Sequence, residues 1–248
     1  TLQESDCTDA VFDNAVISLT TWDKAVLRKA RFAETDLSLS AFGESDCAEA
    51  DFRRVRCYKC LFRQTPLHGA SFQEATLRET LLQGVIGPSL SFAGADLRQL
   101  YLDMESDLSQ ADFRGTDLRD ASLRMSRLPQ TDFSHARLEN ALIVQCDLRE
   151  SRLSGLRAAG CRFSKCDLTG ATLSGSSLLG GSLRKCRLVG ARLSNTNLYA
   201  SDLRDLVISQ PFLGGTPPAE QDAHAVTRFD GANLKRTMLH GKLEVLRL

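Results

Sequence analysis

Large apolar residues recur at every fifth position along almost the whole chain. A first series runs over residues 2–102, a second, displaced by one residue, runs over 108–213, and a short third covers 229–239. A period of five is neither the 3.6-residue period of an amphipathic helix nor the alternation of a half-buried strand. The pattern therefore predicts a repeat protein built from five-residue units.

Two positions of each unit are expected to point inward. The central position is nearly always Leu, Ile, Phe or Trp, and the position two residues before it is usually Ala, Ser, Thr or Cys, as in the unit Ala50-Asp51-Phe52-Arg53-Arg54. No unit can bury its large residue alone, so the units must stack. The exceptions at the central position are Cys7, Cys47, Cys57, Gly87 and Ala158.

A second period of twenty residues indicates that four units make one coil. Successive coils would lie about 4.8 Å apart, giving about eleven coils in a rod on the order of 50 Å long. One column of Phe continues across the displacement of the series, so residues 103–107 are expected to hold a one-residue bulge in a continuous solenoid over 1–213. This column consists of Phe12, Phe32, Phe52, Phe72, Phe92, Phe113 and Phe133.

Units of the form A(D/N)Lxx resemble those of the pentapeptide-repeat family, and the resemblance covers about residues 2–240. It implies an all-β fold, a right-handed quadrilateral β-helix, with the central and the small position inside. Some members, the quinolone-resistance proteins, resemble B-form DNA in size and charge and bind DNA gyrase as dimers. The resemblance thus implies gyrase binding as one alternative function.

Two departures from the repeat interrupt its regularity. Gly87-Pro88 interrupts a central column, and since Pro cannot donate a ladder hydrogen bond, a local kink or small bulge is expected. Residues 214–226 carry no repeat, and their Gly and Pro clusters predict a protruding loop that either is functional or ties down the last coil. Residues 227–248 would form the last units and a C-terminal cap. Because the repeat is already in register at Leu2, the chain is expected to be a fragment or C-terminal domain of a longer protein.

Charge and hydropathy favour no class of charged partner. The 248 residues include 31 Lys and Arg against 31 Asp and Glu, so no global field attracts nucleic acid or an anionic membrane. Because DNA mimicry needs an acidic surface, the zero net charge makes gyrase binding the second-ranked function, after a protein-protein interaction module. No apolar run approaches the ~20 residues of a membrane span, and the first residues lack the basic-then-apolar layout of a signal peptide. We expect a bacterial cytoplasmic protein, or an effector exported without such a signal.

The residues with chemical potential are expected to be core residues. Cys57 and Cys60 have the spacing of a redox or zinc half-site, yet both occupy inward positions, as do the other six cysteines. Free Cys packs as a small hydrophobe, so unpaired thiols and a reducing compartment are predicted. The four histidines lie far apart, and no metal, cofactor or catalytic set is indicated. An enzyme with a site in the loop 214–226 is therefore disfavoured.

Outward positions twenty residues apart form ladders on the surface. One ladder carries Arg immediately after the central residues and is either a basic stripe or a row neutralised by nearby acids. A second ladder is apolar where water is expected, which indicates an interface, unless compression of the coil hides it. The candidate contact residues are Tyr58, Arg78, Arg98 and Arg119 on the first ladder and Leu61, Leu81 and Tyr101, with later Leu142, on the second.

These observations favour a non-enzymatic protein-protein interaction or scaffold module, the repeat domain of a bacterial effector or of a secretion-system accessory protein. The partner would be a protein, with no direct contact to nucleic acid. A dimer through one end of the solenoid is also compatible with the sequence.

Overall fold

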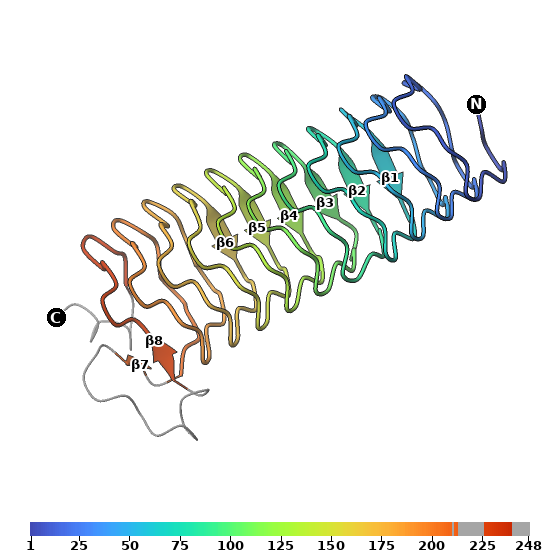
Figure 1. The fold of residues 1–248 in the computed structure, drawn as a ribbon. Coiled ribbons are helices and arrows are strands. Elements are labelled where there is room, and N and C mark those ends of the chain that lie inside the picture. Colours follow the sequence, from blue (N-terminus) through green and yellow to red (C-terminus); the bar gives the residue numbers. More distant parts are fainter. Residues whose placement is uncertain (210, 213–225, 240–248) are drawn as a thin grey trace.

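The computed structural model describes residues 1–209, 211–212 and 226–239, which form an elongated four-sided coil without a helix (Figure 1). Six parallel strands lie side by side on one face, in chain order. A separate parallel pair, β7 and β8, lies near the C-terminal end. The strands are β1 (Leu61–Arg63), β2 (Leu81–Gln83), β3 (Tyr101–Asp103), β4 (Ser122–Arg124), β5 (Leu142–Val144), β6 (Arg162–Ser164), β7 (Pro211–Phe212) and β8 (Thr227–Arg228).

Outside these strands the coils are joined by isolated parallel bridges, mostly between residues twenty apart, such as Asp51↔Ser71 and Thr172↔Arg192. The fold class expected from the sequence, an all-β parallel solenoid, is confirmed. The expected coil count is not matched by the strands, since in the described part of the chain six successive turns carry a three-residue strand on the shared sheet, fewer than the eleven coils expected. The other parts of the coils pair through isolated bridges of single residues.

The corners of the coil come from the residue two places after each central residue. This residue has a left-handed conformation, as at Glu4 (φ 57°) and Asn14 (φ 60°), and glycines such as Gly160 and Gly175 take the place in later coils. A non-glycine residue in this region costs about 1 kcal/mol. The next unit then closes the turn, for example through the amide of Ala10, which donates to the carbonyl of Cys7 at 3.1 Å.

The core is a set of stacked columns, as the repeat predicts. The predicted Phe column is buried from Phe32 onward and partly buried at Phe12, with neighbouring rings nearly parallel. It continues across the displacement of the series, where Phe92 and Phe113 stack with centroids 4.9 Å apart and planes at 16°. A second aromatic column, Trp22, Phe42 and Phe62, meets the first edge to face. Aromatic pairs of this kind add about 0.5–1.5 kcal/mol beyond burial.

The register changes by one residue within β3 and the turn after it. Gln83 pairs with Asp103, twenty residues later, whereas Tyr101 pairs with Ser122, twenty-one residues later. The extra residue lies in the turn, where Met104 (φ 60°) and Glu105 (φ 57°) are both left-handed. Because two consecutive corner residues absorb the insertion, the columns of the core stay aligned on both sides.

The kink or bulge expected at Gly87-Pro88 is absent, so that prediction was wrong. The amide of Gly87 donates to the carbonyl of Asp107 at 2.9 Å and that of Ser89 donates to the carbonyl of Ser109 at 2.8 Å. Pro88 occupies the position after the central residue, whose amide the ladder does not use, so a missing N–H removes no bond. A Cβ on Gly87 would lie 3.2 Å from Leu90 Cδ2, which shows that Leu90 fills the space left in the column.

The second inward position carries a hydrogen bond that joins successive coils. In many coils its hydroxyl donates to the backbone carbonyl of a central residue 23 positions earlier. Examples are Ser176 to Leu153 at 2.6 Å and Thr196 to Leu173 at 2.9 Å. A buried Ser or Thr at this position therefore satisfies both its own hydroxyl and a buried carbonyl.

The solenoid pairing resumes after the non-repetitive segment. Arg192 pairs with Arg228 and Asn197 with Asn233, both 36 residues apart. The predicted loop 214–226 lies outside the described residues except for Val226, and so does the end of the predicted cap, 240–248. The assignments of loop and cap stay predictions.

Candidate interaction surface

The predicted apolar ladder lies on the face formed by β1 to β6. Leu61, Leu81 and Tyr101 are direct partners in three adjacent strands. Leu61 and Leu81 are half-buried, while Tyr101 is 54% exposed. The coil is thus not compressed enough to hide this row, and the three side chains form a contiguous apolar strip on the sheet.

Further apolar residues extend the strip beyond those expected from the sequence. Leu142 and Val144 of β5 are half-buried on the same face, and Met104 and Met125 are about half exposed at its corner. The repeat pattern does not single out the two methionines, because they stand at the corner position, which is polar in most units. Their signal in the sequence is that they occupy the same corner in successive coils. We call these side chains, with Leu61, Leu81 and Tyr101, the apolar strip.

A hollow of about 170 Å³ opens in the middle of the apolar strip. Its lining comes from β2, β3 and β4. Ser122 stands in the column that Leu81 and Tyr101 occupy in the preceding coils, so a small side chain follows two large ones. The hollow is lined by Leu81, Gln83, Tyr101, Leu102, Asp103, Ser122 and Arg124.

A group of cations begins within the apolar strip, at β4, and continues beyond it on the same face. Arg124, Arg162, Lys165 and Lys185 are exposed, and among the described residues none of them has an acidic partner within ion-pair distance. Arg184, between them, is paired with Asp205 at 3.4 Å. The outward positions of this face from the coil of Ser122 to that of Lys185 hold no Asp or Glu. We call the four unpaired residues the basic patch.

The neighbouring arginine ladder is neutralised by its own acids. Arg78 contacts Asp96 at 2.6 Å, Arg98 contacts Asp96 at 2.8 Å and Arg119 contacts Asp117 at 2.6 Å. Exposed pairs of this kind contribute little to stability individually. The interpretation as a basic stripe is therefore not supported.

Tyr58, the first member of that ladder, is also engaged within the chain. Its hydroxyl donates to Glu79 Oε1 at 3.0 Å, and the ammonium group of Lys59 lies 5.0 Å from its ring centroid. These contacts occupy both the ring and the hydroxyl, so Tyr58 offers less free surface than Tyr101.

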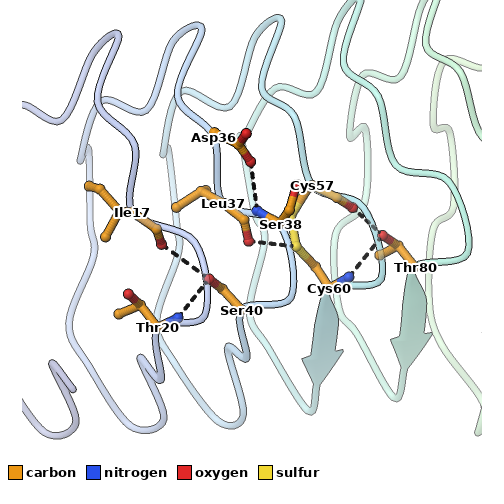
Figure 2. Close-up of a disulfide and its surroundings, with 9 residues drawn as sticks. All are labelled: Ile17, Thr20, Asp36, Leu37, Ser38, Ser40, Cys57, Cys60 and Thr80. Carbon is orange, nitrogen blue, oxygen red and sulfur yellow. Dashed lines mark hydrogen bonds between the residues drawn. A yellow bond between two sulfur atoms is a disulfide. The ribbon is translucent and has the colours of Figure 1, made fainter.

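Cys57 and Cys60 are joined by a disulfide within one coil (Figure 2). Both are buried, as predicted, but the prediction that all cysteines are unpaired was wrong. The central position and the small position of the following unit lie on either side of a corner, which brings their Cα atoms to 5.5 Å. This separation lies within the usual range for a disulfide. Only six of the eight cysteines are free thiols, so the cysteines no longer all support a reducing compartment.

The other cysteines are buried or half-buried thiols. Burial raises the pKa of Cys146 to about 12, and it also raises the pKa of Cys47 and Cys161. Thiols in this state are poor nucleophiles and poor metal ligands. No group of three or more His, Cys, Asp or Glu in the described part of the chain is placed to hold a metal ion.

The four-unit coil and its two inward positions define a parallel β-solenoid of five-residue repeats. A family model for pentapeptide repeats matches residues 2–42, 45–84, 105–134, 131–170 and 166–205. The chain therefore belongs to the pentapeptide-repeat family.

The solved structure of HetL supports this fold. HetL, a pentapeptide repeat protein involved in heterocyst differentiation regulation from the cyanobacterium Nostoc, is 22% identical, and the match covers 96% of this chain and 88% of HetL with a TM-score of 0.53. A trypsin-treated form of QnrB1, a plasmid-mediated fluoroquinolone resistance protein, is 18% identical, covering 94% of this chain and 98% of that one with a TM-score of 0.37. No curated protein matches the chain significantly.

Within the described ranges, no helix has the length and apolar character that a bilayer crossing requires.

Proposed function

We propose that the chain is a non-enzymatic protein-protein interaction module that binds its partner through the apolar strip. The observation that carries this proposal is the row Leu61, Leu81 and Tyr101, which stays accessible on a regular sheet. Elsewhere the repeat places mostly polar residues at the same outward position. A contiguous apolar area on the surface is typical of an interaction site.

The biological setting is part of the proposal. We propose a bacterial scaffold or effector module, cytoplasmic or exported from the cytoplasm. The Cys57–Cys60 disulfide fits an exported protein better than a cytoplasmic one, because disulfides persist in oxidising compartments.

Two alternatives have less support. Gyrase binding by DNA mimicry needs a continuous acidic surface, whereas acids such as Asp96, Asp117 and Asp147 are each paired with an arginine. Inhibition or protection of gyrase in a supercoiling assay at stoichiometric amounts of this protein would favour that alternative. An enzyme site in 214–226 would lie outside the described residues.

A capture experiment with matched variants tests the proposed function. Leu81→Asp places a charge in the apolar strip, and Ile86→Asp places one at the same position of the next unit, on the adjacent face, where Ile86 is 48% exposed. We expect wild type and Ile86→Asp to retain the same protein from a bacterial lysate and Leu81→Asp to lose it, with circular dichroism showing that all three are folded. Equal capture by all three variants would refute the role of the strip.

A further inference from the structure

We infer that the face of β1 to β6 receives an amphipathic α-helix of the partner, with apolar residues on the apolar strip and acidic residues over the basic patch. This inference rests on the proposed function and adds the kind of partner. It follows from the shape of the face, from its occupied backbone groups and from the distribution of its charges.

The dimensions of the face fit a helix that lies along the solenoid axis. Each strand has three residues, which makes the flat part of the face about 10 Å wide, close to the ~10–12 Å diameter of a helix. Successive strands are about 4.8 Å apart, and one helical turn rises about 5.4 Å. Residues three or four apart on the helix would therefore meet successive strands.

An extended partner strand has no backbone edge to join on this face. The amide of Leu81 donates to the carbonyl of Cys60 at 2.9 Å and that of Tyr101 donates to the carbonyl of Thr80 at 3.0 Å. Each strand is thus paired with the coil before it and the coil after it, and strand addition would have to displace a coil. A helix whose apolar face lies on the sheet needs no such bond.

The hollow between Leu81, Tyr101 and Ser122 provides an anchor point. Its lining combines Leu81, Tyr101 and Leu102 with polar side chains, and its volume of about 170 Å³ admits one large apolar side chain of the helix. Anchors of this kind near the centre of an interface contribute a large share of binding energy.

The charges of the face determine the direction of the helix. Arg124, Arg162, Lys165 and Lys185 lie at and beyond β4 without acidic partners among the described residues, while Asp103 ends β3 and Glu105 lies in the turn after it. Unpaired cations favour acidic residues opposite them and favour the C-terminal end of a helix, which carries negative partial charge. The helix should therefore run with its C-terminus toward β6 and carry its acids in that half.

The length of the face sets the length of the probe. From the coil of Leu61 to that of Lys185 there are six steps of about 4.8 Å, or about 29 Å, which a helix of about 20 residues spans. The probe is a surface-displayed library of helical peptides of about 20 residues, with apolar residues fixed three and four positions apart and all other positions random, selected against the full-length chain.

We expect the selected peptides to be enriched in Asp and Glu in their C-terminal half. Their affinity should fall about tenfold or more with Leu81→Asp and with the double variant Arg162→Glu/Lys165→Glu, and it should fall with salt. The matched control is Arg157→Glu/Arg192→Glu, which reverses the charge of two exposed arginines on other faces that have no ion pair within the described part of the chain.

Three results would overturn the inference. These are selected peptides that are neutral or basic in the C-terminal half, peptides whose acids gather in the N-terminal half, and a selection without binders that depend on both Leu81 and the basic patch. Lysate capture that is lost with Leu81→Asp but unchanged with Arg162→Glu/Lys165→Glu would also overturn it, while the proposed function would stand. Capture that survives Leu81→Asp would refute the proposed function itself.

Discussion

The hydroxyl of Thr80 donates a hydrogen bond of 2.6 Å to the backbone carbonyl of Cys57, one coil earlier in the solenoid (Figure 2). The same hydroxyl accepts the amide of Cys60 at 3.3 Å. Thr80 is fully buried, so no water can replace either bond. One small side chain therefore joins two coils beside the disulfide.

Replacement of Thr80 by valine should destabilise the protein although it keeps the shape of the side chain. Thr80→Val leaves the carbonyl of Cys57 and the amide of Cys60 without this partner, which should lower the free energy of unfolding by about 1–3 kcal/mol. Thr80→Ser keeps the hydroxyl and should lose less. Urea unfolding followed by circular dichroism measures both, and equal losses would show that packing rather than the hydroxyl is responsible.

The disulfide should make the protein sensitive to reductant. Thiol titration of the unfolded, unreduced chain should find six free cysteines of the eight. Because the closed loop is short, reduction should lower the free energy of unfolding by only about 2 kcal/mol. The variant Cys57→Leu/Cys60→Ala places at position 57 the Leu that the same column carries at positions 37 and 77. The unfolding of this variant should not respond to reductant. Eight free thiols in the oxidised protein would contradict the disulfide.

Gly181 should not tolerate the alanine that the repeat favours at its position. A Cβ there would lie 2.7 Å from the carbonyl oxygen of Cys161 and 3.0 Å from that of Leu178, both backbone atoms that cannot swing away. Gly181→Ala should therefore cost about 1–3 kcal/mol. Gly180→Ala is the matched control, since its Cβ would meet nothing within 4 Å and only the left-handed φ of 64° opposes it, at about 1 kcal/mol. A smaller loss at Gly181 than at Gly180 would contradict this account.

The Asp-x-Arg pairs should make stability depend on pH in the acid range. Hydrogen bonds from the Arg114 guanidinium hold the pKa of Asp112 below its ordinary value of 3.8 in the folded state. The folded state thus favours the ionised carboxyl, and this contribution is present above the unfolded pKa and is lost as pH falls through the lower, folded pKa. The same direction holds for Asp51, Asp147 and Asp202.

We therefore expect the unfolding midpoint to change little above about pH 5 and to fall below about pH 4. Asp112→Asn should lower the midpoint at neutral pH and show a smaller fall on acidification. An Asp112→Asn variant whose acid dependence equals that of wild type would show that this pair does not contribute.

The repeat in the sequence predicted most of the fold because its physical cause is local. A large residue such as Phe92 and a small one such as Ala95 must both be inside, and the twenty-residue period then aligns Phe92 with Phe113. The pairing of residues that are twenty apart in the sequence could therefore be predicted by counting four units. The apolar row Leu61, Leu81 and Tyr101 could be located for the same reason.

Features that depend on exact distances could not be predicted. The sequence placed Cys57 and Cys60 inside, but whether two inward sulfurs meet across a corner depends on the width of the coil. Likewise Leu90 fills the space at Gly87 because its side chain reaches into the neighbouring column, which no repeat pattern reveals. The sequence does not indicate the basic patch, because it does not show which cations have acidic partners. Arg184 is paired with Asp205, whereas Arg162 has no such partner among the described residues.

The four-unit coil constrains how such a protein can change in evolution. Loss or gain of one unit between Tyr101 and Arg162 would turn every later face by one side of the square, so the basic patch would move away from the apolar strip. Loss or gain of a whole coil keeps both on one side, and the extra corner residue at Met104 and Glu105 is tolerated because it leaves the faces aligned. Insertions in this protein should therefore survive selection when they complete a turn or, like the extra corner residue, leave the faces aligned.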